Sequence, residues 1–373
     1  MNQTAAAQSR HDRLAALLAE DPDNVALIAN AAEAAFAEER FDAAEELLDR
    51  HARLRPLTPQ AQHLAGLVAM RRLDWTRAAD LYAALLAGGA DAPPVRFNLA
   101  WSLAMAKRFD EALAALDTAT SAALPQAAQL EVQLLHQLGQ FDLAGERART
   151  LISLHPEHRG LNAIVSTLAI DIEDTDLAAR TARMAGDHPD ALTTLGTLAL
   201  SEDDPTAAAE LFEAALARAP GAPRAWIGLG LTRMLGGDQA EAARDLDKGA
   251  EMFGTHLGSW IAAGWAHVLA GDRVAGRARF EKALALDDNF GEAQGSIAVV
   301  ELLDGHVEEA RRRTAIALRL DRESFSAALA SMLIAAGEGN SARAATIFET
   351  ALHTPIGADG KTLAHSLAKL GAR

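Results

Sequence analysis

The sequence of 373 residues contains no cysteine, and only 5% of its residues are aromatic, with a single tyrosine. The lack of cysteine excludes a disulfide framework and a thiolate metal site. With so few aromatic residues, alanine and leucine must supply most of the core, and alanine favours helix. Runs of β-branched residues, which are typical of strands, are also scarce. The sequence therefore favours an all-α protein.

The charge and the hydropathy of the chain restrict its partners. The net charge is −16 at pH 7, whereas a nucleic-acid surface needs a clustered basic face. No run of about 18 apolar residues occurs, so we expect no membrane span. The stretch from Met1 to Arg13 lacks the apolar segment of a secretory signal. We therefore expect a cytoplasmic protein that binds no nucleic acid.

The chain does have an internal period. Written with a row length of about 34 residues, the stretch from Leu192 to Leu352 aligns in columns. Two columns hold small residues and a third, four residues after the second, holds mostly larger apolar ones. These columns are Gly196, Gly230, Gly264 and Ala298; Ala208, Ala242, Gly276, Ala310 and Ala344; and Phe212, Leu246, Phe280, Thr314 and Phe348. Residues four apart share one helix face, so the period predicts pairs of helices that cross closely at the small residues.

These columns resemble the tetratricopeptide repeat, a helix-turn-helix unit of about 34 residues. Trp226-x2-Leu229-Gly230 matches the start of its pattern, and Ala208-x3-Phe212 with Pro220 matches the rest. The resemblance implies an all-α, right-handed α-solenoid of about ten such units. This chain departs from the pattern in the tyrosine column of the first helix, which reads Ala199, Arg233, His267 and Glu301.

The repeats divide the chain into five predicted segments. Residues 1–20 form an N-terminal tail and helix, residues 21–156 form repeats one to four, and residues 191–355 form repeats six to ten. Residues 157–190 form an irregular fifth repeat, because the spacing from Ala178 to Ala208 is shorter than that of the regular rows. Residues 356–373 form a capping helix with Leu363, Leu367 and Leu370 on one face, since a repeat array needs a polar terminal element to stay soluble.

No arrangement of residues indicates catalysis, a metal site or a cofactor. Residues 355–362 resemble the end of a phosphate-binding loop, but Pro355 stands where its first glycine belongs. Gly228-x-Gly230 is followed by Arg233 instead of the third glycine of a dinucleotide fingerprint. Since neither motif follows a strand, we interpret them as a turn and as helix packing. We therefore expect a protein without catalytic residues, metal or cofactor.

The resemblance also implies which residues line a partner-binding groove. In this family the first helix of each repeat (helix A) faces a concave groove with its positions 2, 5, 9 and 12, and the second (helix B) faces outward. The apolar and aromatic residues at these positions fall in two groups. The first group is His63, Leu67, Met70, Phe97 and Trp101, and the second is Ile227, Leu231, Met234, Ile261, Trp265, Val268, Val299 and Leu302. A contiguous apolar strip of this kind is typical of a binding site, although part of it can belong to the core between repeats.

Two known recognition modes of the family do not fit the sequence. Gripping a C-terminal carboxylate takes lysine, arginine and asparagine on adjacent A helices, whereas here Asn30, Asn98 and Arg96 lack matching lysines. Holding an extended peptide takes an asparagine in every repeat, which this chain does not have. An apolar groove without such amides favours a helical or hydrophobic protein segment as partner.

The sequence therefore predicts a non-enzymatic scaffold or chaperone-like adaptor that binds such a segment in its groove. Two alternatives stay open. One is an accessory or targeting subunit of an enzyme, such as a glycosyltransferase, or of a secretion machine. The other is a self-associating protein, in which the groove receives a helix of a second copy.

Overall fold

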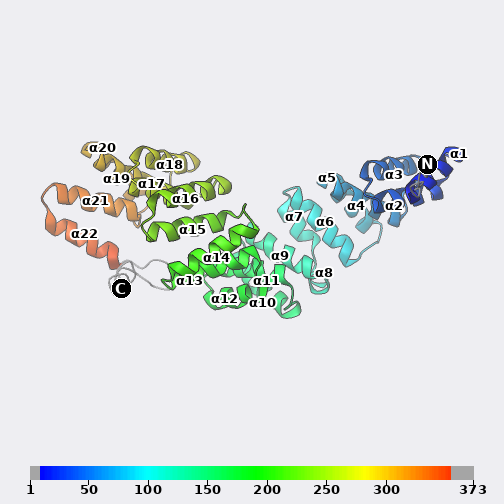
Figure 1. Ribbon diagram of the computed structural model, residues 1–373, viewed down its shortest axis with the longest axis horizontal. Helices are drawn as coiled ribbons and strands as arrows, with labels where there is room; N and C mark the ends of the chain where they lie inside the picture. The colour runs from blue at the N-terminus through cyan, green and yellow to red at the C-terminus, as the bar shows by residue number, and fades with distance from the viewer. Residues whose placement is uncertain (1–8, 354–373) are drawn as a thin grey trace, which may run out of the picture. The chain divides into compact units, whose positions relative to one another are not determined.

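The computed structural model describes residues 9–353, and this part of the chain consists of 22 helices and no strand (Figure 1). The predicted all-α fold of stacked helix pairs is confirmed. The predicted capping helix and the phosphate-loop-like turn lie outside the described residues.

The chain divides into two compact units, and the boundary between Leu168 and Ala169 falls inside a helix. That helix is α11 (Arg159–Asp171), in the irregular fifth repeat. The first unit contains α1 (Arg10–Glu20), α2 (Val25–Ala37), α3 (Phe41–Leu54), α4 (Pro59–Arg71), α5 (Trp75–Ala87), α6 (Pro93–Met105), α7 (Phe109–Ala115), α8 (Thr118–Ala123), α9 (Pro125–Gln137) and α10 (Phe141–Leu154).

The second unit contains the most regular repeats. Its helices are α12 (Thr175–Ala185), α13 (Pro189–Ser201), α14 (Pro205–Arg218), α15 (Pro223–Leu235), α16 (Gln239–Phe253), α17 (Leu257–Leu269), α18 (Arg273–Leu286), α19 (Gly291–Leu303), α20 (Val307–Leu320), α21 (Phe325–Gly337) and α22 (Ser341–His353). Here the odd-numbered helices from α13 on are the A helices, and each packs against the B helix that follows it.

Helix starts follow from local sequence. Several A helices begin with proline, which suits the first turn because its missing N–H would have no partner there. Several B helices begin after an aspartate whose side chain accepts the backbone N–H of the third helical residue, as Asp204 does from Ala207 at 3.0 Å and Asp272 from Ala275 at 2.9 Å. Asn24 caps α2 in the same way, with Leu27 as the donor at 3.1 Å.

The turn from helix A to helix B needs one residue in the left-handed region. In repeats seven to ten this residue is glycine, for example Gly237 with φ 86°. In several earlier repeats it is a residue with a side chain, such as Leu73 with φ 63°. Only glycine adopts this conformation without steric cost, so the earlier turns are built at some expense of stability.

The columns of the sequence meet in the core of the second unit. Phe212 and Leu246 of the B helices are fully buried. Each lies against the glycine of its own A helix, so that a Cβ atom added to Gly196 would lie 2.8 Å from Phe212 Cε1, and one added to Gly230 would lie 2.6 Å from Leu246 Cγ. Burial of such a side chain contributes roughly 1.5–3 kcal/mol. The close helix crossing predicted from the columns is confirmed.

The third and fifth repeats are each followed by a spacing shorter than the regular repeat, and each irregularity has a local cause. The B helix of the third repeat is broken between α7 and α8 at Leu116 and Asp117, where Asp117 starts a new helix by capping Thr120 at 2.7 Å. The break was not predicted, and it lies within the interval from Phe109 to Phe141, which is shorter than the regular repeat. In the fifth repeat, α12 has only 11 residues and ends at Gly186, whose φ is 66°.

Candidate partner-binding surfaces

In the first unit, three of the predicted groove residues converge. Met70 of α4 and Phe97 and Trp101 of α6 are half-buried and pack against one core cluster around Leu99 and Leu103. The ring centroids of Phe97 and Trp101 are 6.2 Å apart, with the rings tilted by 40°. These side chains form a partly exposed aromatic surface over the A helices of repeats two and three.

His63 and Leu67 lie on α4 before Met70, two turns and one turn away respectively, and both are half-buried. The His63 ring lies edge-on to Tyr82, with 5.6 Å between centroids, and burial lowers the pKa of its imidazole. The Tyr82 hydroxyl accepts a hydrogen bond from Asn98 of α6 at 3.1 Å. This end of the surface is therefore polar and held in place by aromatic packing.

In the second unit, six of the predicted groove residues are half-buried, but all of them also touch the core. Ile227, Leu231 and Met234 of α15 pack against the cluster around Leu246, and Val268 of α17 packs beside Phe280. Leu302 of α19 packs against the cluster that contains Ala298 and Ala330. The sixth is Trp265.

Two predicted groove residues belong to the core instead. Ile261 is 9% exposed and Val299 is 3% exposed. Val299 is covered because α19 and α21 run close together, as the 3.0 Å distance between the Ser296 and Ser326 hydroxyls shows. Neither side chain can offer a partner more than a small part of its surface.

Trp265 lies between repeats. Its ring centroid is 5.5 Å from that of Phe280, and the side chain packs against two clusters, one around Phe280 and Ile297 and the other around Val299 and Ala330. The sequence predicted a groove anchor here, with a wedge between repeats as the alternative. These contacts favour the wedge.

The most exposed apolar column of the second unit was missed by the sequence analysis. Leu235, Leu269 and Leu303 end the A helices of repeats seven, eight and nine, and they are 63%, 57% and 46% exposed. They stand one repeat length apart, directly after the half-buried Met234, Val268 and Leu302. Their regular spacing is visible in the sequence and could have identified them. We call these three residues the leucine ladder.

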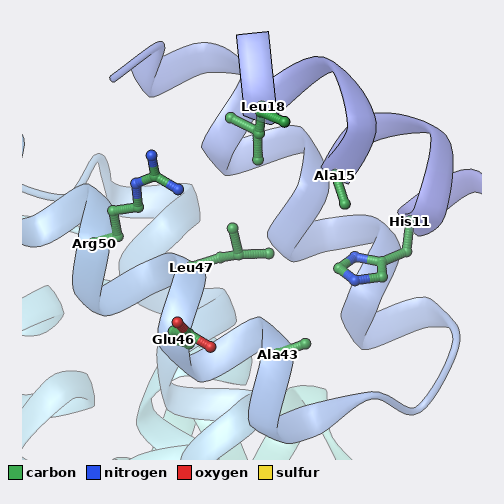
Figure 2. Close-up of a pocket in the computed structure, with 8 residues that line it drawn as sticks. His11, Ala15, Leu18, Ala43, Glu46, Leu47 and Arg50 are labelled. Atoms are coloured by element: carbon green, nitrogen blue, oxygen red, sulfur yellow. The ribbon is translucent and has the colours of Figure 1, made fainter. Parts of the chain in front are cut away.

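A hollow of about 310 Å³ lies at the N-terminal end of the first unit, between α1 and α3. Figure 2 shows His11 of α1 and Leu47 of α3 pointing into it. Its remaining lining is Ala15, Leu18, Ala19, Ala43, Glu46 and Arg50. The lining is thus mixed, with alanine and leucine side chains next to His11, Glu46 and Arg50.

Comparison with known proteins gives the family. Sequence models of the tetratricopeptide repeat match residues 2–68, 63–128 and 193–253, which together make up about half of the chain. The chain belongs to the tetratricopeptide repeat family. A search of the curated proteins finds no significant match.

A comparison with solved structures finds several matching chains. IFIT1, as a monomeric mutant with Gppp-AAAA, is 11% identical, with 87% of this chain and 89% of that chain covered and a TM-score of 0.55. PilF of Pseudomonas aeruginosa is 17% identical over 51% of this chain and 88% of that chain, with a TM-score of 0.43. The Cut9–Hcn1 hetero-tetramer of the APC/C is 12% identical over 92% and 87%, with a TM-score of 0.42. At these identities the likeness to IFIT1 concerns the fold alone.

Three of the four residues that stand in the tetratricopeptide tyrosine column, Arg233, His267 and Glu301, are polar or charged and pair across helices. Arg233 donates to Asp245 at 2.6 Å, and His267 lies 2.9 Å from Asp247, which also accepts from Arg279 at 2.7 Å. Burial raises the pKa of Asp245 in spite of Arg233. Burial also acts to raise the pKa of Asp247, but the hydrogen bonds from Arg279 and His267 outweigh it and leave that pKa lowered. Ion pairs therefore link neighbouring helices where the family has an aromatic ring.

The glycines that resemble a nucleotide fingerprint serve packing, as predicted. The Phe212 ring fills the space beside Gly228, and the Leu246 side chain fills that beside Gly230. Within residues 9–353, histidine and acidic side chains form no group of three or more that could hold a metal ion. None of the helices described there is long and apolar enough to cross a membrane.

Proposed function

We propose that this tetratricopeptide repeat protein is a non-enzymatic scaffold or chaperone-like adaptor that holds a helical or hydrophobic segment of a partner protein on its A helices. Tetratricopeptide repeats generally mediate protein binding. One observation carries the finer proposal. Half-exposed apolar side chains recur at the same A-helix positions in consecutive repeats, which gives a continuous apolar strip within each unit.

The first unit offers the better-defined anchors. Large half-exposed aromatic side chains are the residue types that dominate binding energy at protein interfaces. Phe97 and Trp101 are such residues, and the half-buried Leu67 lies one turn before Met70 on the neighbouring A helix. In the second unit, Leu231, Met234, Val268 and Leu302 offer the same kind of surface, while Ile261 and Val299 contribute only to the core.

Site-specific photo-cross-linking tests the proposal. A photoreactive residue at Leu67 of α4 is compared in cells with one at Ala84, an exposed residue of the B helix α5. We expect a discrete protein adduct from position 67 that is absent from position 84 and that weakens when Trp101 is replaced by alanine. Identical adducts from both positions, or an adduct at position 67 that consists of the chain itself, would refute the proposal. The second result would instead favour self-association.

A further inference from the structure

The leucine ladder lies on the edge of the second unit where each A helix turns into its B helix. Single exposed leucines are common on protein surfaces, whereas here three strongly exposed leucines stand at equivalent positions of successive repeats. Valines extend the apolar edge in the following turns, since Val274 is 82% and Val307 41% exposed. The turns of repeats eight and nine also touch, because Arg273 donates to the carbonyl oxygen of Leu303 at 2.9 Å. The ladder and the valines therefore form one apolar edge.

Carboxylates border this edge in each successive turn. The exposed acidic residues of the turns are Glu202, Asp204, Asp238, Asp272, Asp304 and Glu308. Arg273 and Arg277 pair with Asp304 at 3.1 Å and 3.6 Å, and Arg311 pairs with Glu308 at 3.6 Å, so the six carboxylates outnumber the three arginines that approach them. The border is therefore negative overall, in a chain whose net charge is −16. A partner that buries the leucines must bring basic groups to the same edge.

A helix that lies along the ladder can meet its leucines with one apolar stripe. Packed helices lie about 8–10 Å apart, so leucines at equivalent ends of neighbouring repeats are separated by about that distance. Two turns of an α-helix advance roughly 11 Å, which puts residues i, i+7 and i+14 opposite three successive leucines. This advance lies just above the range of about 8–10 Å, and the repeat of about 7 Å between side chains on one face of a strand lies just below it.

We propose that the leucine ladder binds a basic amphipathic helix of a partner protein, with apolar residues spaced by seven and lysine or arginine on its flanks. The leucines receive the apolar stripe, and the carboxylates of the turns receive the basic flanks. The edge adjoins the groove of the proposed function, but the inference rests on the exposed leucines and the charges of the turns. Substitutions in the groove and on the edge can therefore be tested separately.

Peptide binding to the full-length protein tests this inference. The probe is a labelled synthetic 18-residue helix with leucine on one face and lysine on the other, and its comparison peptide carries glutamate in place of lysine. In the test variant, Leu235, Leu269 and Leu303 are replaced by serine. The matched control replaces Met252, Leu286 and Leu320 by serine, because these residues form a second exposed column, with the same one-repeat spacing, at the ends of the B helices.

We expect the lysine peptide to bind the wild type and the control variant equally well, and to lose roughly tenfold or more in affinity with the ladder variant. The glutamate peptide should not bind. A third variant, Asp204→Asn with Asp238→Asn and Asp272→Asn, keeps the capping oxygens but removes three charges, and it should weaken binding and its dependence on salt.

Three results would overturn the inference. Equal binding of the lysine peptide to the ladder variant would show attraction by charge alone. Equal binding of both peptides would remove the role of the carboxylates. A wild-type dimer in light scattering that becomes monomeric in the ladder variant would make a second copy of the chain the occupant. Cross-linking at Leu67 does not depend on any of these three results. Failure of the groove proposal can therefore be told apart from failure of the ladder inference.

Discussion

Arg277 of α18 donates a hydrogen bond of 2.6 Å to Glu301 of α19, which is only 5% exposed and also lies 2.8 Å from Nδ1 of His306. The hydrogen bond from Arg277 is the main cause that lowers the pKa of Glu301 to about 2, against 4.5 for an ordinary glutamate. Glu301 stands in the tyrosine column of its repeat. An ion pair between adjacent repeats thus takes the place of an aromatic contact.

This pair makes stability depend on pH in the acid range. Because the folded pKa is below the unfolded one, the contribution of Glu301 is fully present above about pH 4.5 and is lost as the pH falls toward 2. The shift corresponds to roughly 3 kcal/mol as an upper bound. We expect the free energy of unfolding of the wild type to fall more steeply between pH 5 and about pH 2.5 than that of Glu301→Gln. Denaturant titrations of both proteins at a series of pH values check this. Equal dependence of the free energy of unfolding on pH in the two proteins would contradict it.

The close approach of helices at Gly230 predicts a large effect of one methyl group. A Cβ at this position would lie 2.6 Å from Cγ of Leu246 and 3.1 Å from its backbone nitrogen. Overpacking costs about 1–3 kcal/mol, and alanine regains about 1 kcal/mol of helix propensity. We expect Gly230→Ala to destabilise the protein by up to about 2 kcal/mol in denaturant unfolding. Gly221→Ala is the control, because nothing lies within 4 Å of a Cβ there, and it should unfold like the wild type.

The left-handed residue of the second repeat predicts a stabilising substitution. Leu73 has φ 63° and is 68% exposed, so glycine would relieve the backbone without losing core packing. We expect Leu73→Gly to raise the free energy of unfolding by roughly 0.5–1 kcal/mol, since strain relief exceeds the entropy that glycine adds to the unfolded chain. Gly237→Leu makes the reverse change at φ 86° and should destabilise. Thermal unfolding of both variants tests this. If the melting temperatures of Leu73→Gly and Gly237→Leu shift in the same direction relative to the wild type, the explanation is wrong.

The sequence predicted the contacts that depend on one residue pair and missed those that depend on how helices cross. Gly196 against Phe212 follows from two columns of fixed spacing, and the structure confirms it. The burial of Val299 depends on how closely α19 approaches α21, which no single repeat encodes. The same holds for the exposure of Leu269 beside the half-buried Val268, because adjacent residues on a helix differ by about 100° and only the packing shows which one faces outward.

Trp265 gives the sharpest test of where the core ends and the binding surface begins. Its ring packs beside Phe280 and contacts clusters on both sides of repeat nine. Introducing a charge there would leave it partly buried without a partner, so we expect Trp265→Glu to cost roughly 3 kcal/mol or more of stability. Leu269→Glu, one turn further along α17 at a side chain that is 57% exposed, should change stability by less than about 0.5 kcal/mol. Denaturant unfolding of the two variants compares them directly. If Trp265→Glu is as stable as the wild type, the tryptophan is a groove anchor and not a wedge; if it unfolds early, the binding surface of the second unit must be carried by its other half-exposed residues.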